Sequence, residues 1–297
     1  MRTLSFNICL FGLFISVGCN KTTDYGESYE LSEVENPGES LNDDDDVEAE
    51  DGDSTDADES TETDETAEEQ VDNRTYAQKL VVSMMMPGVF NPSNLEETST
   101  ISYLLVHWTR VGTEVTWTEE LCHIRATEAH NTQTTFPAAF VNTMPIREHY
   151  ATLSAEEVGA EFVVDTFVNV DGAALPSPES DRLPTSASDS RLVDQDSDGH
   201  PGITIHIDAP WGVSGNIYLA QRSHYSFEGV VTAQDRVEAY VTYDQEQSII
   251  DASSGFLTMA DVVPTPNPDE TTSYVLFQEV DDDTDCSDIK RDNDALF

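Results

Sequence analysis

The stretch ISYLLVHWTRVGTEVTWTEEL, residues 101–121, decides the fold class. Tyr103 and Leu105 alternate with their neighbours in its first part, and the alternation resumes at Val115 after Gly112. Side chains with a period of two lie on opposite faces of a β-strand, and Gly is a common turn residue. The stretch therefore predicts two antiparallel strands joined by a tight turn.

The same alternation recurs along most of the chain after residue 75. It is found in residues 77–86, 162–170, 203–207, 217–221, 225–231, 237–243 and 274–280. Helix signals are few: Ser154 and Glu157 form a capping-box pattern that predicts about two turns of helix, ending at Gly159. We therefore expect an all-β domain of about ten short strands with one short helix.

The connections between these strands favour one antiparallel domain over residues 76–297. The hairpins after Gly202 follow one another as a meander, which is typical of an up-and-down barrel. A two-layer β-sandwich is the alternative. Residues 174–202 form a long loop rich in Pro, Ser and Asp, and loops of this length are usually functional or disordered.

The N-terminus has the features of a secretory signal. Arg2 precedes a mostly apolar stretch at residues 4–17, which suits a signal-peptide core and is short for a membrane span. Ser16-Val17-Gly18-Cys19 then resembles the lipobox of bacterial lipoproteins, although Ser16 stands where that family usually has Leu. The resemblance implies that residues 1–18 are a lipoprotein signal peptide and that Cys19 becomes the lipidated first residue. Ordinary secretion is the alternative.

Lipidation at Cys19 implies a membrane anchor in a bacterial cell envelope, because several acyl chains together bind a bilayer stably. In enterobacterial lipoproteins Asp after the Cys favours retention in the inner membrane, so Asn20 favours the outer membrane. Whether the protein faces the periplasm or the cell surface stays open at this point.

Residues 19–75 form an acidic segment between the signal peptide and the β-rich part. Residues 20–73 contain 23 Asp and Glu and one base, Lys21, without a helical or strand period. Such a composition buries too little apolar surface to fold, so it predicts a disordered linker. The whole chain has 59 Asp and Glu against 13 Lys and Arg, which argues against nucleic acid as a partner, because phosphate binding needs clustered bases.

The four cysteines separate into two groups. Cys9 lies in the signal peptide and Cys19 is the lipidated residue of the resemblance, which leaves Cys122 and Cys286. An even pair in an oxidising compartment predicts a disulfide, here between an early strand and the C-terminal tail. Two free thiols are the alternative.

One cluster of candidate catalytic residues emerges. His206, Asp208 and His224 lie on predicted neighbouring strands, where they could converge as a transition-metal or general-base site. Polar side chains on a solvent-facing sheet are the alternative interpretation, and we assign no catalytic residue from the sequence.

Two classes of function remain. The first is a non-enzymatic lipoprotein whose β-domain binds a ligand or protein partner, or serves the envelope structurally; the second is a secreted hydrolase whose active site carries no recognised motif. Trp108, Trp117 and Trp211 could line a ligand pocket, although tryptophans in a β-core more often serve packing. We favour the first class because a binding domain needs only an apolar cavity or a surface patch, whereas an enzyme needs converging catalytic groups.

Residues 194–199 read DQDSDG, which resembles the first half of an EF-hand loop, D-x-D-x-D-G. The resemblance implies a calcium site in which Asp194, Asp196 and Asp198 turn their carboxylates to one cation. Gly199 permits the bend, and the carbonyl of His200 supplies a further oxygen.

The calcium loop departs from the EF-hand where the coordination shell should close. Ile205 stands in place of the bidentate Glu, so a closing ligand has to come from elsewhere, with Asp189 and Asp208 as candidates. We expect a structural site that pins the long loop to the strand after Gly202. An acidic surface turn without a cation is the alternative.

Overall fold

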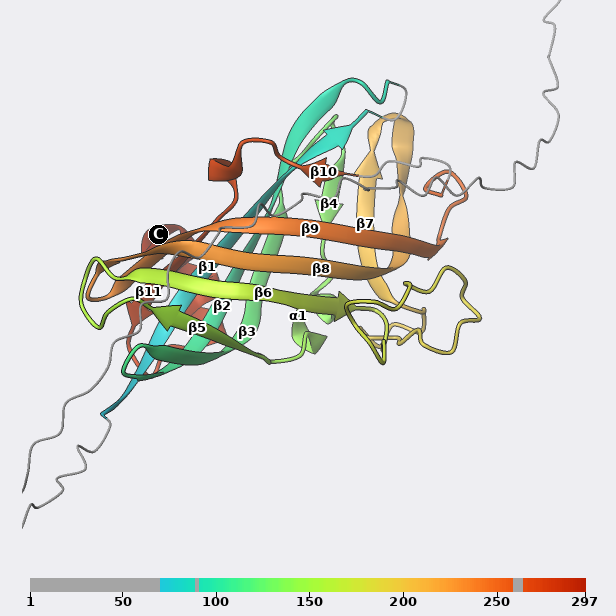
Figure 1. Ribbon diagram of the computed structural model, residues 1–297. Helices are drawn as coiled ribbons and strands as arrows, with labels where there is room; N and C mark the ends of the chain where they lie inside the picture. Colours follow the sequence, from blue (N-terminus) through green and yellow to red (C-terminus); the bar gives the residue numbers. More distant parts are fainter. Residues whose placement is uncertain (1–69, 89–90, 259–263) are drawn as a thin grey trace, which may run out of the picture. The chain divides into compact units, whose positions relative to one another are not determined.

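The predicted alternation corresponds to strands throughout the part of the chain that the computed structural model describes, residues 70–88, 91–258 and 264–297. Within it, eleven strands form one antiparallel sheet (Figure 1). They are β1 (Val71–Pro87), β2 (Leu95–Val111), β3 (Glu114–Ala126), β4 (Gln133–Thr135), β5 (Arg147–Leu153), β6 (Glu161–Asp171), β7 (Ile203–Ala209), β8 (Val213–Ala233), β9 (Arg236–Ala252), β10 (Thr265–Pro266) and β11 (Tyr274–Val280). The predictions for the signal peptide, for Cys19 and for the linker up to residue 69 lie outside the described residues. β1 begins at Val71, five residues inside the predicted linker.

Eight of these strands close into a ring. Around it they follow one another in chain order, β1-β2-β3-β5-β6-β8-β9-β11, and β11 returns to pair with β1. Every pairing in the ring is antiparallel. The prediction of an up-and-down barrel is therefore confirmed, and the sandwich alternative is not what forms.

The helices lie elsewhere than predicted. Residues 154–158 form bends and a turn, because the Ser154 hydroxyl accepts the N–H of Glu161 across the β5–β6 hairpin and does not cap a helix. The α-helices are α1 (Ala138–Thr143) and α2 (Cys286–Leu296), with 3-10 turns at Pro210–Gly212 and Glu270–Thr272. Asp285 caps α2 by accepting from the N–H groups of Ser287 and Asp288. No helix among the described residues is long and apolar enough to cross a membrane.

One half of the ring is filled by aromatic side chains. Trp108 lies 5.9 Å from Trp117, 5.7 Å from Phe162, 5.7 Å from Phe277 and 5.2 Å from Tyr76 between ring centroids. All five are buried in one hydrophobic cluster, which we call the aromatic plug. Edge-to-face and offset contacts at these separations are favourable.

A disulfide joins the outside of the barrel to α2. Cys122 on β3 is bonded to Cys286, as predicted, and the two lie 164 residues apart in the chain. Ile289 of α2 is fully buried in a cluster with outward-facing residues such as Ala77 and Tyr103. The helix therefore covers an outer face of β1, β2 and β3.

The strand that pairs with β8 changes along the length of β8. β8 pairs with β9 along nearly its whole length, while on its other side it pairs first with β7 and then with β6. The exchange occurs at Gly172 and Gly202, both with positive φ, where an added Cβ would lie 2.5 Å and 2.4 Å from the carbonyl oxygen of Leu219. No side chain fits there, so only glycine lets β6 and β7 meet β8 end to end.

Candidate functional site

The half of the barrel beyond the aromatic plug encloses a cavity of about 860 Å³. The strand period positions its lining: on β1, Gln78, Leu80 and Val82 face inward, while Ala77 and Val81 pack outward with α2. The other walls come from β2 to β9 and from α1. Their apolar lining includes Leu104, Leu121, Phe140, Ile203, Ile205, Ile217 and Leu219.

The cavity reaches the protein surface. Its lining includes Trp211 and Phe256, whose side chains are 82% and 71% exposed, and we call the region around them the mouth. Of the three tryptophans considered above, only Trp211 lines the cavity. Trp108 and Trp117 pack in the plug, as the packing interpretation predicted.

Charged side chains enter the cavity on neighbouring strands. Glu119 on β3 stands opposite Arg147 on β5 in the register of the sheet. Arg147 Nη2 lies 2.6 Å from Asp171 Oδ1, and His149 Nε2 lies 3.1 Å from Glu119 Oε1, outside hydrogen-bond geometry. The one guanidinium lining the cavity is thus already paired with a carboxylate.

Gln78 differs from these groups. Its side chain is 0% exposed, and neither its amide oxygen nor its amide nitrogen has a hydrogen-bond partner among the described residues. It stands opposite Leu104 on β2 and Phe277 on β11, which offer no polar group. An unpartnered buried amide in a native structure calls for an explanation, and a ligand in the adjoining cavity supplies one.

Two tyrosines stand opposite each other on β8 and β9, with ring centroids 5.0 Å apart. Low access to water raises the pKa of Tyr225 to about 12 and also raises the pKa of Tyr243. The Tyr243 hydroxyl donates to Gln245, and Gln245 Nε2 donates to Gln221 Oε1 at 3.1 Å. Both phenols therefore stay neutral at physiological pH, and this side of the cavity is polar without charge.

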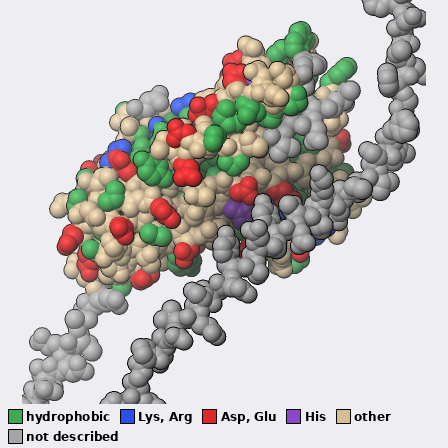
Figure 2. All heavy atoms as spheres, turned by 45° about the horizontal axis from the view of Figure 1, so that its top comes forward, with side chains coloured by type: hydrophobic (Ala, Val, Ile, Leu, Met, Phe, Trp, Pro, Cys, Tyr) green, Lys and Arg blue, Asp and Glu red, His purple; other side chains and the backbone are tan. Residues whose placement is uncertain are grey.

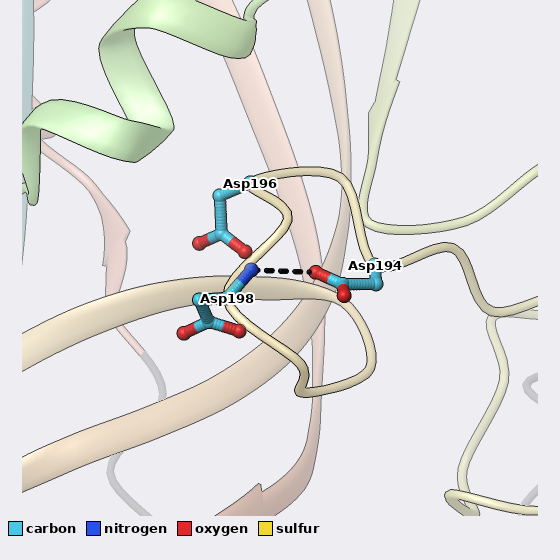
Figure 3. Close-up of side chains that lie close together, drawn as sticks. All are labelled: Asp194, Asp196 and Asp198. Carbon is cyan, nitrogen blue, oxygen red and sulfur yellow. Dashed lines mark hydrogen bonds between the residues drawn. The ribbon is translucent and has the colours of Figure 1, made fainter.

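The acidic loop forms a second candidate site (Figure 3). Asp194, Asp196 and Asp198 each place a carboxylate oxygen within 4.8 Å of the others, so the cluster could hold a metal ion. The Asp194 carboxylate accepts the N–H groups of Asp198 and Gly199 at 3.1 Å and 3.0 Å. These bonds shape the tight turn that brings the three acids together.

The loop is fastened to β7 through Thr204. Its N–H donates to Asp196 Oδ2 at 2.8 Å, and its hydroxyl donates to Asp198 Oδ2 at 2.7 Å. Asp196 is 4% exposed, and its other oxygen, Oδ1, has no partner among the described residues. A buried carboxylate oxygen without a donor is costly unless a cation neutralises it.

The other carboxylates considered for this site do not belong to the cluster. Asp189 pairs with Arg191, which lowers the pKa of that carboxyl to about 2, and Asp208 lies beside His206 on β7. The His200 imidazole stacks on Tyr218 at 4.0 Å, and its Nε2 lies 3.3 Å from the Tyr218 hydroxyl. The backbone carbonyl of His200 as a ligand stays a prediction.

The structure does not assemble the predicted histidine cluster. His206 Nε2 lies 3.4 Å from Asp208 Oδ2, and His206 Nδ1 lies 2.8 Å from the side chain of Asn216 on β8. His224 lies farther along β8, opposite Val168, and belongs to no group of potential metal ligands among the described residues. The interpretation as polar side chains of a sheet describes this arrangement better.

Acidic side chains are spread over the surface shown in Figure 2, with few Lys and Arg among them. The chain has a formal charge of -46, so the field around the cavity favours neutral or cationic molecules over anions.

No protein-family model matches the chain, and comparisons with curated proteins and with solved structures also find no match.

Proposed function

We propose that this protein binds a small, largely apolar molecule inside its barrel. The observation that carries the proposal is the cavity of about 860 Å³, which reaches the surface at its mouth. Ligand pockets commonly measure about 300–1,000 Å³, with apolar walls and a few convergent polar groups. The cavity matches that description, because apolar side chains of β1, β7 and β8 line it together with the polar side chains of Gln78, Tyr225 and Tyr243.

The proposal includes the lipid anchor predicted at Cys19. The lipobox-like residues 16–19 support it. The protein then presents its cavity at a bacterial envelope, in the outer membrane, without acting as an enzyme. Incorporation of radiolabelled palmitate tests the anchor: the wild type is expected to be labelled and Cys19→Ala not, and an unlabelled wild type contradicts it.

We also propose that the cluster of Asp194, Asp196 and Asp198 binds calcium. The specific support is Asp196, whose Oδ1 is buried without a donor beside two other carboxylates. Calcium takes several oxygen ligands in flexible geometry and tolerates water in its shell, which suits a site with three carboxylates. Its role is structural, because Thr204 joins the loop to the β7 wall of the cavity.

Titration with N-phenyl-1-naphthylamine, an uncharged dye that fluoresces in apolar surroundings, tests the binding function. Ser102 lines the cavity on β2, so Ser102→Trp places an indole in the space that the dye would occupy. His107 is exposed on the other face of the same strand, and His107→Trp is the matched control. We expect saturable binding to the wild type and to His107→Trp, and little binding to Ser102→Trp. Equal binding to all three proteins would place the dye outside the barrel and overturn the proposal.

A further inference from the structure

This inference rests on the proposed binding of a ligand inside the barrel. The polar groups of the cavity then restrict the chemical class of that ligand. The ionisable acids and bases among the described lining residues are Glu119, Arg147, Asp171 and His130, and His130 Nδ1 lies 3.1 Å from Glu96 Oε2. Arg147 is bonded to Asp171, so no free cation awaits an anionic head group. A fatty carboxylate entering this space meets two carboxylates, in a protein whose net charge is strongly negative.

The same geometry gives a cationic head group one carboxylate, that of Glu119, because Asp171 is paired with Arg147 at 2.6 Å. The His149 imidazole lies 3.1 Å from Glu119 without a hydrogen bond to it. An ammonium group would lose its hydration on entering, and this desolvation cost exceeds the attraction of a single carboxylate. The cavity therefore favours a head group that carries no charge.

Gln78 adds a positive requirement. Its amide presents an N–H donor and a carbonyl acceptor, both unpartnered, at a position where the neighbouring strands supply Leu104 and Phe277. Both atoms are left without a bond in the ligand-free protein, so a ligand gains most affinity if its polar end bonds both of them. A hydroxyl or primary amide can do so, whereas an ester can only accept.

We propose that the cavity selects an uncharged amphiphile whose polar end both donates and accepts hydrogen bonds, such as a long-chain alcohol or primary amide. The polar end lies against Gln78, and the apolar chain lies along Leu80, Val82 and the isoleucines of β7 toward the mouth. Gln78 is then the specificity-determining residue of the site.

Displacement of bound N-phenyl-1-naphthylamine by a series of twelve-carbon compounds, kept below their micelle concentrations, tests this selectivity. Dodecan-1-ol and dodecanamide are expected to bind about tenfold more tightly than methyl dodecanoate or dodecanoate. The methyl ester can only accept, so it leaves the carbonyl oxygen of Gln78 without a donor. Dodecanoate brings a charge into the cavity that finds no partner there. Dodecylammonium is expected to bind as weakly as dodecanoate.

Substitution of Gln78 identifies the residue responsible. In Gln78→Leu, the advantage of the alcohol and the amide over the methyl ester should disappear while the dye still binds. Gln245→Leu, which alters a partnered glutamine of the same cavity, should keep that advantage, and Gln78→Met gives a second apolar variant if Gln78→Leu does not fold.

The possible results separate this inference from the proposed function. Dodecanoate or dodecylammonium binding as tightly as the alcohol would overturn the selectivity while leaving the binding function intact. A preference for the alcohol that survives in Gln78→Leu would overturn the role of Gln78. A wild type that binds neither the dye nor any compound of the series would overturn the binding function itself.

Discussion

Gln78→Leu should make the ligand-free protein more stable, although it removes a polar group from the proposed binding site. Gln78 is fully buried, and both polar atoms of its amide lack partners among the described residues. Leu has a similar volume and is apolar, like the neighbouring Leu80 and Leu104 of the cavity wall. Natural proteins retain such a costly residue chiefly where function requires it.

The magnitude follows from the cost of an unsatisfied buried polar group, about 1–3 kcal/mol. We therefore expect the free energy of unfolding to rise by about 1–3 kcal/mol. For a domain of this size, each kcal/mol corresponds to about 2–4 °C in Tm, so Tm should rise by roughly 2–12 °C.

Urea unfolding followed by tryptophan fluorescence, together with a thermal melt by circular dichroism, measures the effect. The matched control is Gln245→Leu, which deprives the Tyr243 hydroxyl and Gln221 of a partner and should lower stability. If Gln78→Leu is destabilised to the same extent as Gln245→Leu, then Gln78 is satisfied in the folded protein. The reasoning about its role would then be refuted.

Three further predictions concern other parts of the molecule. Millimolar calcium should raise Tm by mass action in the wild type but not in Asp196→Ala, and a wild-type Tm that calcium leaves unchanged contradicts the cation site. Replacing Cys122 and Cys286 together by Ala should lower the free energy of unfolding by about 2–5 kcal/mol in urea, and no change would show that the 164-residue cross-link adds nothing. Because burial raises the pKa of Tyr225 to about 12, above its unfolded value of about 10, its contribution to stability is complete below about pH 10 and is lost as pH rises toward 12. Urea unfolding at pH 8 and 11 should therefore show a smaller loss of stability for Tyr225→Phe than for the wild type, and equal losses would contradict the shift.

Local patterns predicted the strands because burial on one face imposes a period of two. Residues 77–86 and 101–121 became parts of β1, β2 and β3 for this reason. The closure of the ring depends on β11 pairing with β1, which lies at the other end of the β-domain sequence, so the barrel could only be favoured over the sandwich. The disulfide was predictable from the count of cysteines.

The candidate sites were predicted unequally. The spacing of Asp194, Asp196 and Asp198 in a tight turn was enough to predict their convergence, since that geometry is local. The partners of Asp189 and His206 were not, because Arg191 and Asn216 compete for them in ways that the spacing does not reveal.

The residues that line the cavity were not predicted, although one signal for them was present. In residues 77–86, Gln78 shares the face of Leu80 and Val82, and a polar residue on the buried face of a strand often marks a functional position. The start of α2 also had a sequence signal, because Asp285 and Asp288 have the spacing of a capping box.

Nuclear magnetic resonance of the protein labelled with ¹³C at its methionine methyl groups shows whether a ligand binds inside the barrel. Met84, Met86 and Met144 line the cavity, whereas Met85 is not among the lining residues of β1. Addition of dodecan-1-ol should shift the signals of Met84, Met86 and Met144 in a saturable way and leave that of Met85 nearly unchanged. Unchanged signals for the three lining methionines at saturating alcohol, or a shift confined to Met85, would contradict a ligand inside the barrel.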